Sequence, residues 1–345
     1  EDYPGGIGST TNPKVAARWQ VFDFLALRGS VSTTFRAPTI GQASPLCAVG
    51  VANLGGQYRA VRTCGNAALK PEEADTFNVG ALFEYGGFRA SIDYFNFDFK
   101  DELTIESASR LFSTMFPAGA PARCDVAELA ARFQFAGGVC SAANVLRIDV
   151  NNVNGPSTKT SGIDVRAEYN HEDFLLEGSS WQVGAEATYL IKYKRGAFTL
   201  NGAPQIEFAP AEDRAGLHDL TGQFFSYPEL RANAWLQVNH GDWTARWQTR
   251  FTEGTSPAFG TTLYITVPDP SAAFGRRLVA TGKSNDFWQH DIVVRWRAPW
   301  DALVTLSVQN VFDKDPPYVA SQYNYDYTNG NPLGRVFEVG VKKLF

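Results

Sequence analysis

Four cysteines are the residues whose spacing first suggests chemistry in this chain. They form two pairs, Cys47 with Cys64 and Cys124 with Cys140, and the members of each pair are about 16 residues apart. Neither pair has the Cys-x-x-Cys spacing typical of metal sites, and no histidine is near either pair. Because each pair falls inside one predicted loop, we expect two loop-closing disulfides formed in an oxidising compartment, each worth ~3 kcal/mol. Zinc binding or catalysis by these cysteines is the less favoured alternative.

The other residue types give little sign of catalysis. Four histidines are scattered along the chain and form no metal-binding set: His171, His218, His240 and His290. The sequence contains no GxSxG, HExxH or P-loop motif. We therefore predict that the protein is not an enzyme and has no catalytic, cofactor or metal site.

Arginines recur on the polar faces of the predicted strands. They are Arg18, Arg28, Arg166, Arg231, Arg246, Arg250, Arg295 and Arg297. One interpretation is a basic interior that attracts an anionic ligand. The other, which we favour, is that these arginines pair with a domain that fills the interior and with carboxylates on the same faces, namely Asp164, Glu168, Glu186 and Asp291. Of the set, we select Arg246, Arg250, Arg295 and Arg297 as candidate residues that face an interior space.

A tyrosine-rich segment near the C-terminus is the second candidate for ligand contact. Tyr323, Tyr325 and Tyr327 alternate with Asn324 and Asp326 in a predicted loop. Aromatic rings in a loop could stack on a sugar or on an aromatic chelate. The simpler explanation, which we favour, is that these tyrosines pack one loop against its neighbour.

The composition limits the classes of protein to be considered. The chain has 345 residues, of which 13% are aromatic and 19% are charged, and its net charge of -5 gives no reason to expect a nucleic-acid partner. No stretch approaches the roughly 18 apolar residues of a membrane-spanning helix. The sequence begins at Glu1 without the pattern of a signal peptide, and we expect it to start inside a longer chain.

Eleven alternating segments predict an all-β protein. They cover residues 15–21, 25–35, 77–85, 88–94, 150–169, 181–191, 230–238, 243–251, 288–296, 303–312 and 335–345. In each, apolar and polar residues alternate with the period of two that is typical of a strand. The connections alternate between short and long, which is the pattern of a transmembrane barrel with tight periplasmic turns and long external loops.

Several details of this pattern can be tested in a structure. The alternation changes face beyond Phe95, which suggests a bulge or an extension above the membrane. Residues 125–133 could form a short helix. Aromatic residues near the strand ends suit the two interfacial girdles of a membrane barrel. A soluble β-rich binding protein would instead bury Trp243, Trp247, Trp288 and Trp296 between two sheets.

Counting strands back from the C-terminus gives a further prediction. If Phe345 is periplasmic, the first of eleven strands begins outside the cell, whereas bacterial barrels have an even number of strands. An open sheet edge is not tolerated in lipid. We therefore expect this chain to be part of a larger barrel or to be completed by another chain.

Short motifs spread over the chain resemble those of TonB-dependent outer-membrane receptors. In order they are Asn12-Pro13-Lys14 with Arg18-Trp19, Leu27-Arg28-Gly29-Ser30, Phe35-Arg36-Ala37-Pro38, Leu69-Lys70-Pro71-Glu72, Asp93-Tyr94-Phe95, Asn152-Val153-Asn154, Ser161-Gly162-Ile163-Asp164, Asn310-Val311-Phe312-Asp313-Lys314 with Tyr318, and the terminal Phe345. Each motif is weak alone, but their order and spacing make a specific match.

This resemblance implies a location, partners and a function. The family's barrel has 22 strands in the bacterial outer membrane, so residues 1–345 would be its C-terminal part and the plug domain would lie outside this sequence. The implied partners are outer-membrane lipid, the N-terminal half of the barrel with its plug, the TonB-ExbB-ExbD complex, and the barrel-assembly machinery, which would recognise Phe345. The implied function is energy-coupled uptake of a scarce nutrient, such as an iron-siderophore complex or a glycan.

A different membrane function remains open at this point. The chain could be half of a passive porin or of a structural outer-membrane barrel, completed by a partner chain. A plug domain with a TonB-contact segment, encoded upstream of Glu1 or nearby, would distinguish the transporter from both alternatives.

Overall fold

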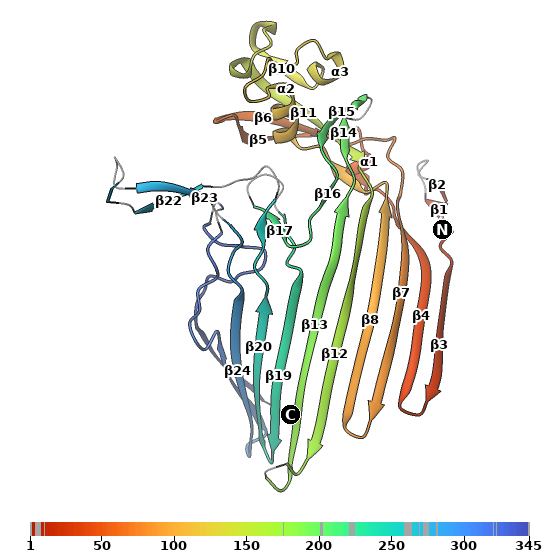
Figure 1. Cartoon of the computed structure of the whole chain (residues 1–345), viewed down its shortest axis with the longest axis vertical. Helices are drawn as coiled ribbons and strands as arrows, with labels where there is room; N and C mark the ends of the chain where they lie inside the picture. Colours follow the sequence, from red (N-terminus) through yellow and green to blue (C-terminus); the bar gives the residue numbers. More distant parts are fainter. Residues whose placement is uncertain are drawn as a thin grey trace.

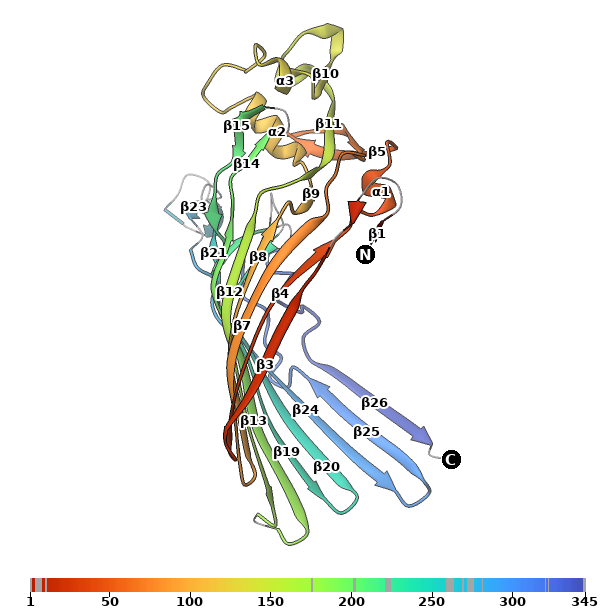
Figure 2. The same cartoon turned by 90° about the vertical axis from the view of Figure 1, so that its right-hand side faces the viewer.

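One large curved sheet dominates the structure (Figure 1 and Figure 2). The computed structural model describes all residues except 1, 4–7, 10, 175, 201–202, 221–224, 259–263, 269, 272–275, 281, 320, 322 and 344–345. Eleven long antiparallel strands each pair with the next long strand along the chain. They are β3 (Lys14–Phe22), β4 (Leu25–Arg36), β7 (Glu72–Tyr85), β8 (Phe88–Lys100), β12 (Thr158–Glu172), β13 (Ser179–Arg195), β19 (Leu230–His240), β20 (Trp243–Thr252), β24 (Phe287–Ala298), β25 (Ala302–Gln309) and β26 (Val336–Lys343). The prediction of an all-β antiparallel architecture with eleven long strands is confirmed.

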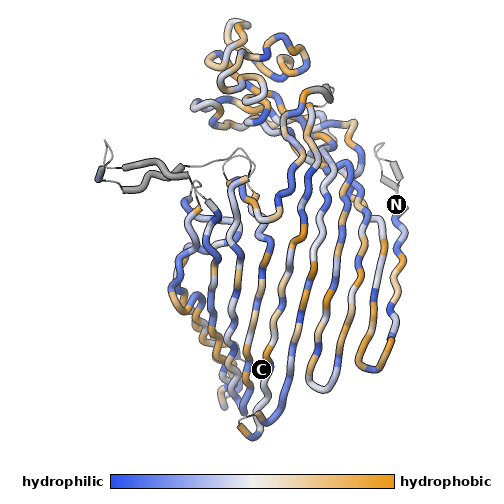
Figure 3. Tube along the Cα trace, in the orientation of Figure 1, coloured by the Kyte–Doolittle hydropathy of each residue, from blue (hydrophilic) through white to orange (hydrophobic). Residues whose placement is uncertain are grey.

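The alternation of residue types gives the sheet two different faces. On β8, Ile92 is 50% exposed, whereas its neighbour Asp93 is 7% exposed and pairs with Arg28 of β4. Hydrophobic and hydrophilic positions alternate in the same way along the other long strands (Figure 3). The convex face is therefore an apolar surface that none of the described segments covers, which suits contact with lipid. We call the concave face, which carries Arg28 and Asp93, the inner face.

The tryptophans decide between a membrane barrel and a soluble protein. Trp243, Trp247 and Trp288 are 52%, 46% and 51% exposed on the convex face, so the prediction that a soluble protein would bury them is not met. Trp243 stacks on Trp296 with ring centroids 5.5 Å apart, and Trp300 meets Trp296 edge-on at 5.1 Å. These rings lie at the end of the sheet that has short turns, where an interfacial girdle is expected.

The two ends of the sheet differ in their connections. Hairpins such as those at Gly86, between β7 and β8, and Gly241, between β19 and β20, close one end. Both glycines have positive φ angles, 57° and 54°, which a tight turn requires. At the other end the connections are long, and several of them fold together. The predicted alternation of short and long connections is confirmed, and it assigns the hairpin end to the periplasm.

The long connections before β7, β12 and β19 build a small domain, here called the cap. Its elements are α1 (Ile40–Ala43), β5 (Cys47–Leu54), β6 (Gln57–Cys64), β9 (Leu103–Ile105), α2 (Ala108–Met115), α3 (Ala127–Ala130), β10 (Phe133–Phe135), η1 (Ala136–Gly138), η2 (Ala142–Asn144), β11 (Val145–Asn154), β14 (Phe198–Leu200) and β15 (Ala203–Ala209). Five strands form a sheet, four of them in the order β10-β11-β6-β5 and β9 paired with β11. A cluster of buried side chains that includes Leu111, Met115 and Ile148 lies in this cap. The hydrophobic core therefore belongs to the cap, whereas the large sheet exposes its apolar face.

The remaining strands are short. They are β1 (Asp2–Tyr3), β2 (Gly8–Ser9), β16 (Glu212–Asp213), β17 (Leu217–Asp219), β18 (Phe225–Ser226), β21 (Ser256–Pro257), β22 (Tyr264–Pro268) and β23 (Arg276–Ala280). β17 pairs with both β18 and β21 beside the outer ends of β19 and β20. Among the residues that the structure describes, no helix has the length and apolar character needed to cross a membrane.

The predicted fifth strand is wrong at its beginning. Instead of one strand over 150–169, β11 ends at Asn154 and β12 begins at Thr158. The strand is interrupted at Gly155, whose amide donates a hydrogen bond to the carbonyl of Glu102. The side chain of Asn154 donates to the carbonyls of Lys70 and Asp101 and so holds the break in place. β11 instead pairs in parallel with β6 of the cap.

Three smaller predictions also have outcomes. β8 continues to Lys100 with unbroken register to both β7 and β12, so the change of face beyond Phe95 is an extension and not a bulge. In the predicted helix at 125–133 only α3 is helical, and the longer α2 was not predicted. The loop that carries Cys47 and Cys64 is an ordered hairpin, β5–β6.

The large sheet has two edge strands. In the part of the chain that the structure describes, β3 pairs only with β4, and β26 pairs only with β25. Both strands expose apolar side chains on the convex face, among them Val15 and Val341. A lipid-facing sheet of this kind needs a partner for each edge, because unpaired backbone groups in a bilayer cost several kcal/mol each.

Candidate functional site

The inner face of the sheet is hollowed where its longest strands meet. The hollow has a volume of about 730 Å³ and lies over β8, β12, β13, β19 and β20. Its charged and amide lining comes from Asp164, Arg166, Glu186, Arg231, Asn233 and Arg250, and its aromatic lining includes Phe95, Tyr193 and Tyr227. The hollow therefore combines several guanidinium groups with aromatic surface.

The arginines of the hollow differ in how far they are neutralised. Arg250 donates to Asp291 at 2.7 Å, and Arg166 lies 3.2 Å from Glu168 and 3.6 Å from Glu186. Arg231 instead donates to the amide oxygen of Asn329, which carries no charge. Among the described residues, Arg231 is thus the guanidinium lining the hollow that has no carboxylate in salt-bridge contact.

A tryptophan between two arginines forms the wall below the hollow. Trp235 of β19 is 7% exposed, and the guanidinium carbons of Arg166 and Arg246 each lie 5.4 Å from its ring centroid. The ring crosses β13 at Gly184, where an added Cβ would lie 2.3 Å from the indole. Cation–π contacts on both sides fix the ring and the two arginines relative to one another.

The four arginines selected from the sequence fall into two groups. Arg250 lines the hollow, and Arg246 packs on Trp235 just below it. Arg295 and Arg297 lie on β24 closer to the periplasmic hairpins, and among the described residues neither has a carboxylate partner. Pairing with inward carboxylates is thus found for Arg28, Arg166 and Arg250. For Arg295 and Arg297, pairing with a domain that fills the interior stays a prediction.

A stack of aromatic rings that was not predicted from the sequence begins in the lining of the hollow. The rings of Tyr193 and Tyr227 are 4.2 Å apart and nearly parallel, and Tyr227 stacks in turn on Phe225 at 5.4 Å. Arg214 covers the far side of Phe225 at 4.3 Å and is bound to Glu212. Tyr193 follows a register shift in the pairing of β12 with β13, so simple alternation along the strand does not place its ring on the inner face.

The tyrosine-rich loop lies beyond the upper edge of this wall. The ring of Tyr323 is 6.4 Å from that of Tyr325 and 5.3 Å from that of Tyr327, so the three tyrosines contact one another. Asn329 connects the same loop to Arg231 of the hollow. Packing of these tyrosines against a neighbouring loop stays a prediction, as does contact of Tyr323, which is 55% exposed, with a ligand.

A buried polar network anchors this loop. Asp326 accepts hydrogen bonds from Ser226 at 2.6 Å, from Asn329 at 2.6 Å and from the hydroxyl of Thr328 at 2.6 Å. Burial alone would raise the pKa of Asp326, but these hydrogen bonds outweigh it and hold the pKa below the ordinary value. The carboxylate is therefore charged at neutral pH and fixes the loop to β18.

His218 extends the network under the loop. Its Nδ1 is 3.0 Å from the hydroxyl of Thr255, which is 3.4 Å from that of Ser226. Burial lowers the pKa of His218, and the charges of Asp326 and Asp219 oppose this only in part. The imidazole is therefore neutral at neutral pH. The sequence alone predicted no role for this histidine.

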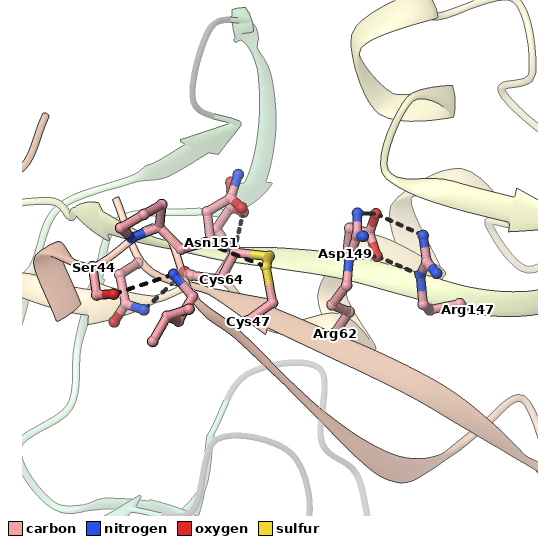
Figure 4. Close-up of a disulfide and its surroundings, with 11 residues drawn as sticks. Ser44, Cys47, Arg62, Cys64, Arg147, Asp149 and Asn151 are labelled. Carbon is pink, nitrogen blue, oxygen red and sulfur yellow. Dashed lines mark hydrogen bonds and ion pairs between the residues drawn. A yellow bond between two sulfur atoms is a disulfide. The ribbon is translucent and has the colours of Figure 1, made fainter. Parts of the chain in front are cut away.

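Both predicted disulfides are present, and both lie in the cap. Figure 4 shows the disulfide between Cys47 and Cys64. Cys47 and Cys64 join directly paired positions of β5 and β6. Cys124 and Cys140 close the segment that holds α3 and β10. In the described part of the chain, no group of three or more histidines, cysteines and carboxylates is placed to hold a metal ion. The proposed assembly signal at Phe345 lies outside the described residues.

Comparison with known proteins assigns the architecture to a family. The model of the TonB dependent receptor-like β-barrel matches residues 2–311. The chain belongs to the TonB-dependent receptor family. The resemblance seen in the sequence motifs is thereby confirmed, and with it the location in the bacterial outer membrane.

Individual relatives of this TonB-dependent receptor chain agree with the family assignment. Over 104 residues it is 33% identical to an iron-regulated outer membrane virulence protein of Vibrio cholerae, covering 30% of this chain and 15% of the relative. The siderophore receptor PirA from Acinetobacter baumannii has a TM-score of 0.58 and 16% identity over 98% of this chain and 41% of PirA. A mutant of the ferric enterobactin receptor PfeA from Pseudomonas aeruginosa, in complex with enterobactin, has a TM-score of 0.58 and 15% identity over 97% of this chain and 40% of PfeA.

These similarities have a defined extent. The two solved receptors share the fold of this chain at low identity. The chain spans about two fifths of the length of each solved receptor, since it covers 41% and 40% of them. The similarity to these two receptors therefore extends over only that share of their length.

Proposed function

We propose that residues 1–345 form the C-terminal part of a 22-stranded barrel that imports a scarce anionic nutrient, such as an iron-siderophore complex, across the outer membrane. The observation that carries this proposal is the hollow of about 730 Å³ on the inner face, where guanidinium groups and aromatic rings meet. The relatives named above are siderophore receptors or iron-regulated, which supports an iron chelate over a glycan. Transport would be driven by TonB-ExbB-ExbD through a plug domain supplied by the rest of the protein.

The lining of the hollow suits a planar anionic ligand. Among the described residues, Arg231 has no carboxylate in salt-bridge contact, and Tyr193 and Tyr227 line the hollow as members of a fixed stack of rings. A guanidinium can form charge-assisted hydrogen bonds to anionic oxygens, and the edges of fixed rings can contact a conjugated chelating group in an edge-to-face arrangement. A neutral glycan would gain from the rings but little from the arginine.

The open edges of the sheet support a larger barrel. β3 and β26 both need a partner strand in lipid, and one additional sheet that begins beside β3 and ends beside β26 would satisfy both. The same sheet would convert the concave inner face into a closed lumen wall. The barrel-assembly machinery would insert the whole barrel, with Phe345 as the proposed recognition residue.

Binding by the full-length receptor tests the proposed site. We expect Arg231→Gln to weaken the Kd for an anionic ferric siderophore by about 10- to 100-fold, the equivalent of one charge-assisted hydrogen bond. Arg89→Gln is the matched control, because Arg89 pairs with the exposed Glu84 close to a periplasmic hairpin. Equal affinities of both variants and the unchanged receptor would show that the hollow is not the binding site.

Uptake in cells separates the transporter from the alternative. The second candidate function is a passive porin or a structural barrel half completed by a partner chain, which also accounts for the two open edges. A transporter takes up radiolabelled ferric siderophore only when TonB is present, whereas diffusion through a porin does not depend on TonB. Uptake that persists unchanged in a tonB deletion strain would refute energy coupling.

A further inference from the structure

The cap has an open sheet edge of its own. Within the described residues, β5 pairs with β6 on one side and with no strand on the other. The residues from Cys47 to Val51 are all exposed, and the disulfide between Cys47 and Cys64 staples the hairpin at its base. An exposed and rigid edge of this kind is a ready template for a further strand.

The register of the hairpin determines which backbone groups point to the open edge. The amide of Gly65 donates to the carbonyl of Leu46, so Leu46 is at a hydrogen-bonded position. In an antiparallel pair such positions alternate. Ala48, Gly50 and Ala52 therefore bond to β6, whereas Val49 and Val51 direct their N–H and C=O groups outward.

The side chains of the same two residues are also unusually exposed. Val49 and Val51 are 66% and 71% exposed, and Tyr58, at the tip of β6, is 80% exposed. Three large apolar side chains so close together on one hairpin mark a site of protein contact. Backbone groups and apolar side chains thus offer one surface, here called the β5 edge.

A charge network lies beside these valines and adds a requirement for the partner. Arg62, which pairs across the hairpin with Val49, donates to Asp149 at 2.5 Å and 3.0 Å. Arg147 donates to the same carboxylate at 2.8 Å, so one negative charge serves two positive ones (Figure 4). The network keeps one net positive charge, which favours an acidic residue in the neighbouring segment.

The position of the β5 edge indicates where its partner comes from. β5 and α1 lie on the same side of the wall as β24, β25 and β26, which is the concave side (Figure 2). This is the side that the remainder of a 22-stranded barrel would occupy. The solved relatives are more than twice as long as this chain, since it covers 41% and 40% of them, so a long segment is available to reach the cap.

We propose that the β5 edge is completed by an extended segment from an extracellular loop of the amino-terminal half of the same polypeptide. The segment adds as a strand to β5, with apolar side chains on Val49 and Val51 and an acidic residue toward Arg62 and Arg147. This inference rests on the proposed function only in that it needs the amino-terminal half of the barrel. The added strand would join the loops of the two halves above the barrel without any covalent bond.

Amide exchange at single-residue resolution in the full-length receptor tests the proposal. If a strand covers the edge, the amides of Val49 and Val51 exchange at least about 100-fold more slowly than unprotected amides. Ala48 and Gly50 are internal references, because β6 protects them in either case. If the amides of Ala48 and Gly50 are protected but those of Val49 and Val51 are not, the proposal is wrong. This result would include the case in which the β5 edge binds a separate protein.

A substitution then identifies the segment. Val51→Pro removes the outward N–H without breaking a bond to β6, and Val51→Thr keeps both the N–H and a β-branched side chain as the control. We expect Val51→Pro alone to raise exchange at least about 10-fold in one extracellular segment of the amino-terminal half. Changes confined to residues 47–64 would overturn the assignment. TonB-dependent uptake of the ferric siderophore, measured in parallel, reports on the proposed function separately.

Discussion

Substituting Gly184 by alanine is the sharpest test of the wall that holds the arginines. In the full-length receptor the new Cβ would lie 2.3 Å and 2.6 Å from two atoms of the Trp235 indole, so the ring must move by about 1 Å to reach normal contact. Such overpacking costs about 1–3 kcal/mol. The displaced ring also loses its contacts with Arg166 and Arg246, each worth about 0.5–1 kcal/mol.

An opposing contribution makes the sign of the result informative. Alanine is preferred over glycine inside a strand by about 0.5–1 kcal/mol, because glycine loses more backbone entropy on folding. The expected net effect of Gly184→Ala is therefore a loss of about 1–4.5 kcal/mol in the free energy of unfolding. Urea titration in detergent micelles, followed by tryptophan fluorescence, measures this quantity.

A double-mutant cycle decides whether the ring is the cause. In a Trp235→Ala background the space over residue 184 is open, so Gly184→Ala should be neutral or stabilising by up to about 1 kcal/mol. The seven tryptophans that remain of the eight still report unfolding. If Gly184→Ala lowers the free energy of unfolding equally in both backgrounds, contact with the Trp235 ring does not explain why residue 184 is a glycine.

Two further predictions concern the loop anchor and the cap. The folded pKa of His218 is below its ordinary value near 6.5, so the opened loop binds more protons; anchorage is complete above about pH 6.5 and weakens as pH falls toward the folded pKa. Amide hydrogen exchange in residues 323–330, corrected for intrinsic rates, should therefore accelerate as the pH falls from about 7.5 to about 5.5. The substitution His218→Gln should remove this pH dependence. Replacing Cys47 and Cys64 by serine should lower the opening free energy of the hairpin by about 3 kcal/mol, measured by exchange in β5 and β6. Unchanged hairpin protection, or equal acceleration in β13, would contradict it.

The large sheet could be predicted from the sequence because its strands obey a single rule. Each position either faces lipid or faces the polar interior, so apolar and polar residues alternate, as at Ile92 and Asp93. In the part of the chain that the structure describes, no second layer packs against the convex face to complicate that pattern. The bounds of β19 and β20 accordingly differ from the predicted ones by two residues or fewer.

The cap could not be predicted in the same way. Its strands are short, and β11 mixes apolar residues with Arg147, Asp149 and several asparagines, so its sequence could not be separated from that of β12. The only local signal for the interruption between β11 and β12 is the Gly155-Pro156 pair, in which Pro156 disfavours a continuous strand. The parallel pairing of β6 with β11 joins residues more than 80 positions apart, which no local pattern reports.

The candidate site was predicted in part. Alternation placed Arg250 on the inner face, but ion pairing depends on side-chain reach across strands, so the differences between Arg250, Arg231 and Arg297 needed the structure. Trp235 could have been found, because its parity sets it among inward polar residues. Tyr227 follows β18 in a connection without alternation, and no signal in the sequence places its ring beside Tyr193.

The unequal lengths of the strands have a consequence for how the site is connected to the cap. β13 has 17 residues and β12 has 15, whereas β25 and β26 have 8 each and β3 has 9. At ~3.4 Å per residue, β13 extends about 30 Å further along its own axis than β25 or β26. Tyr193, which lines the hollow, is only five residues before Phe198 of the cap strand β14. The longest strand pair of the wall therefore connects the hollow directly to the cap.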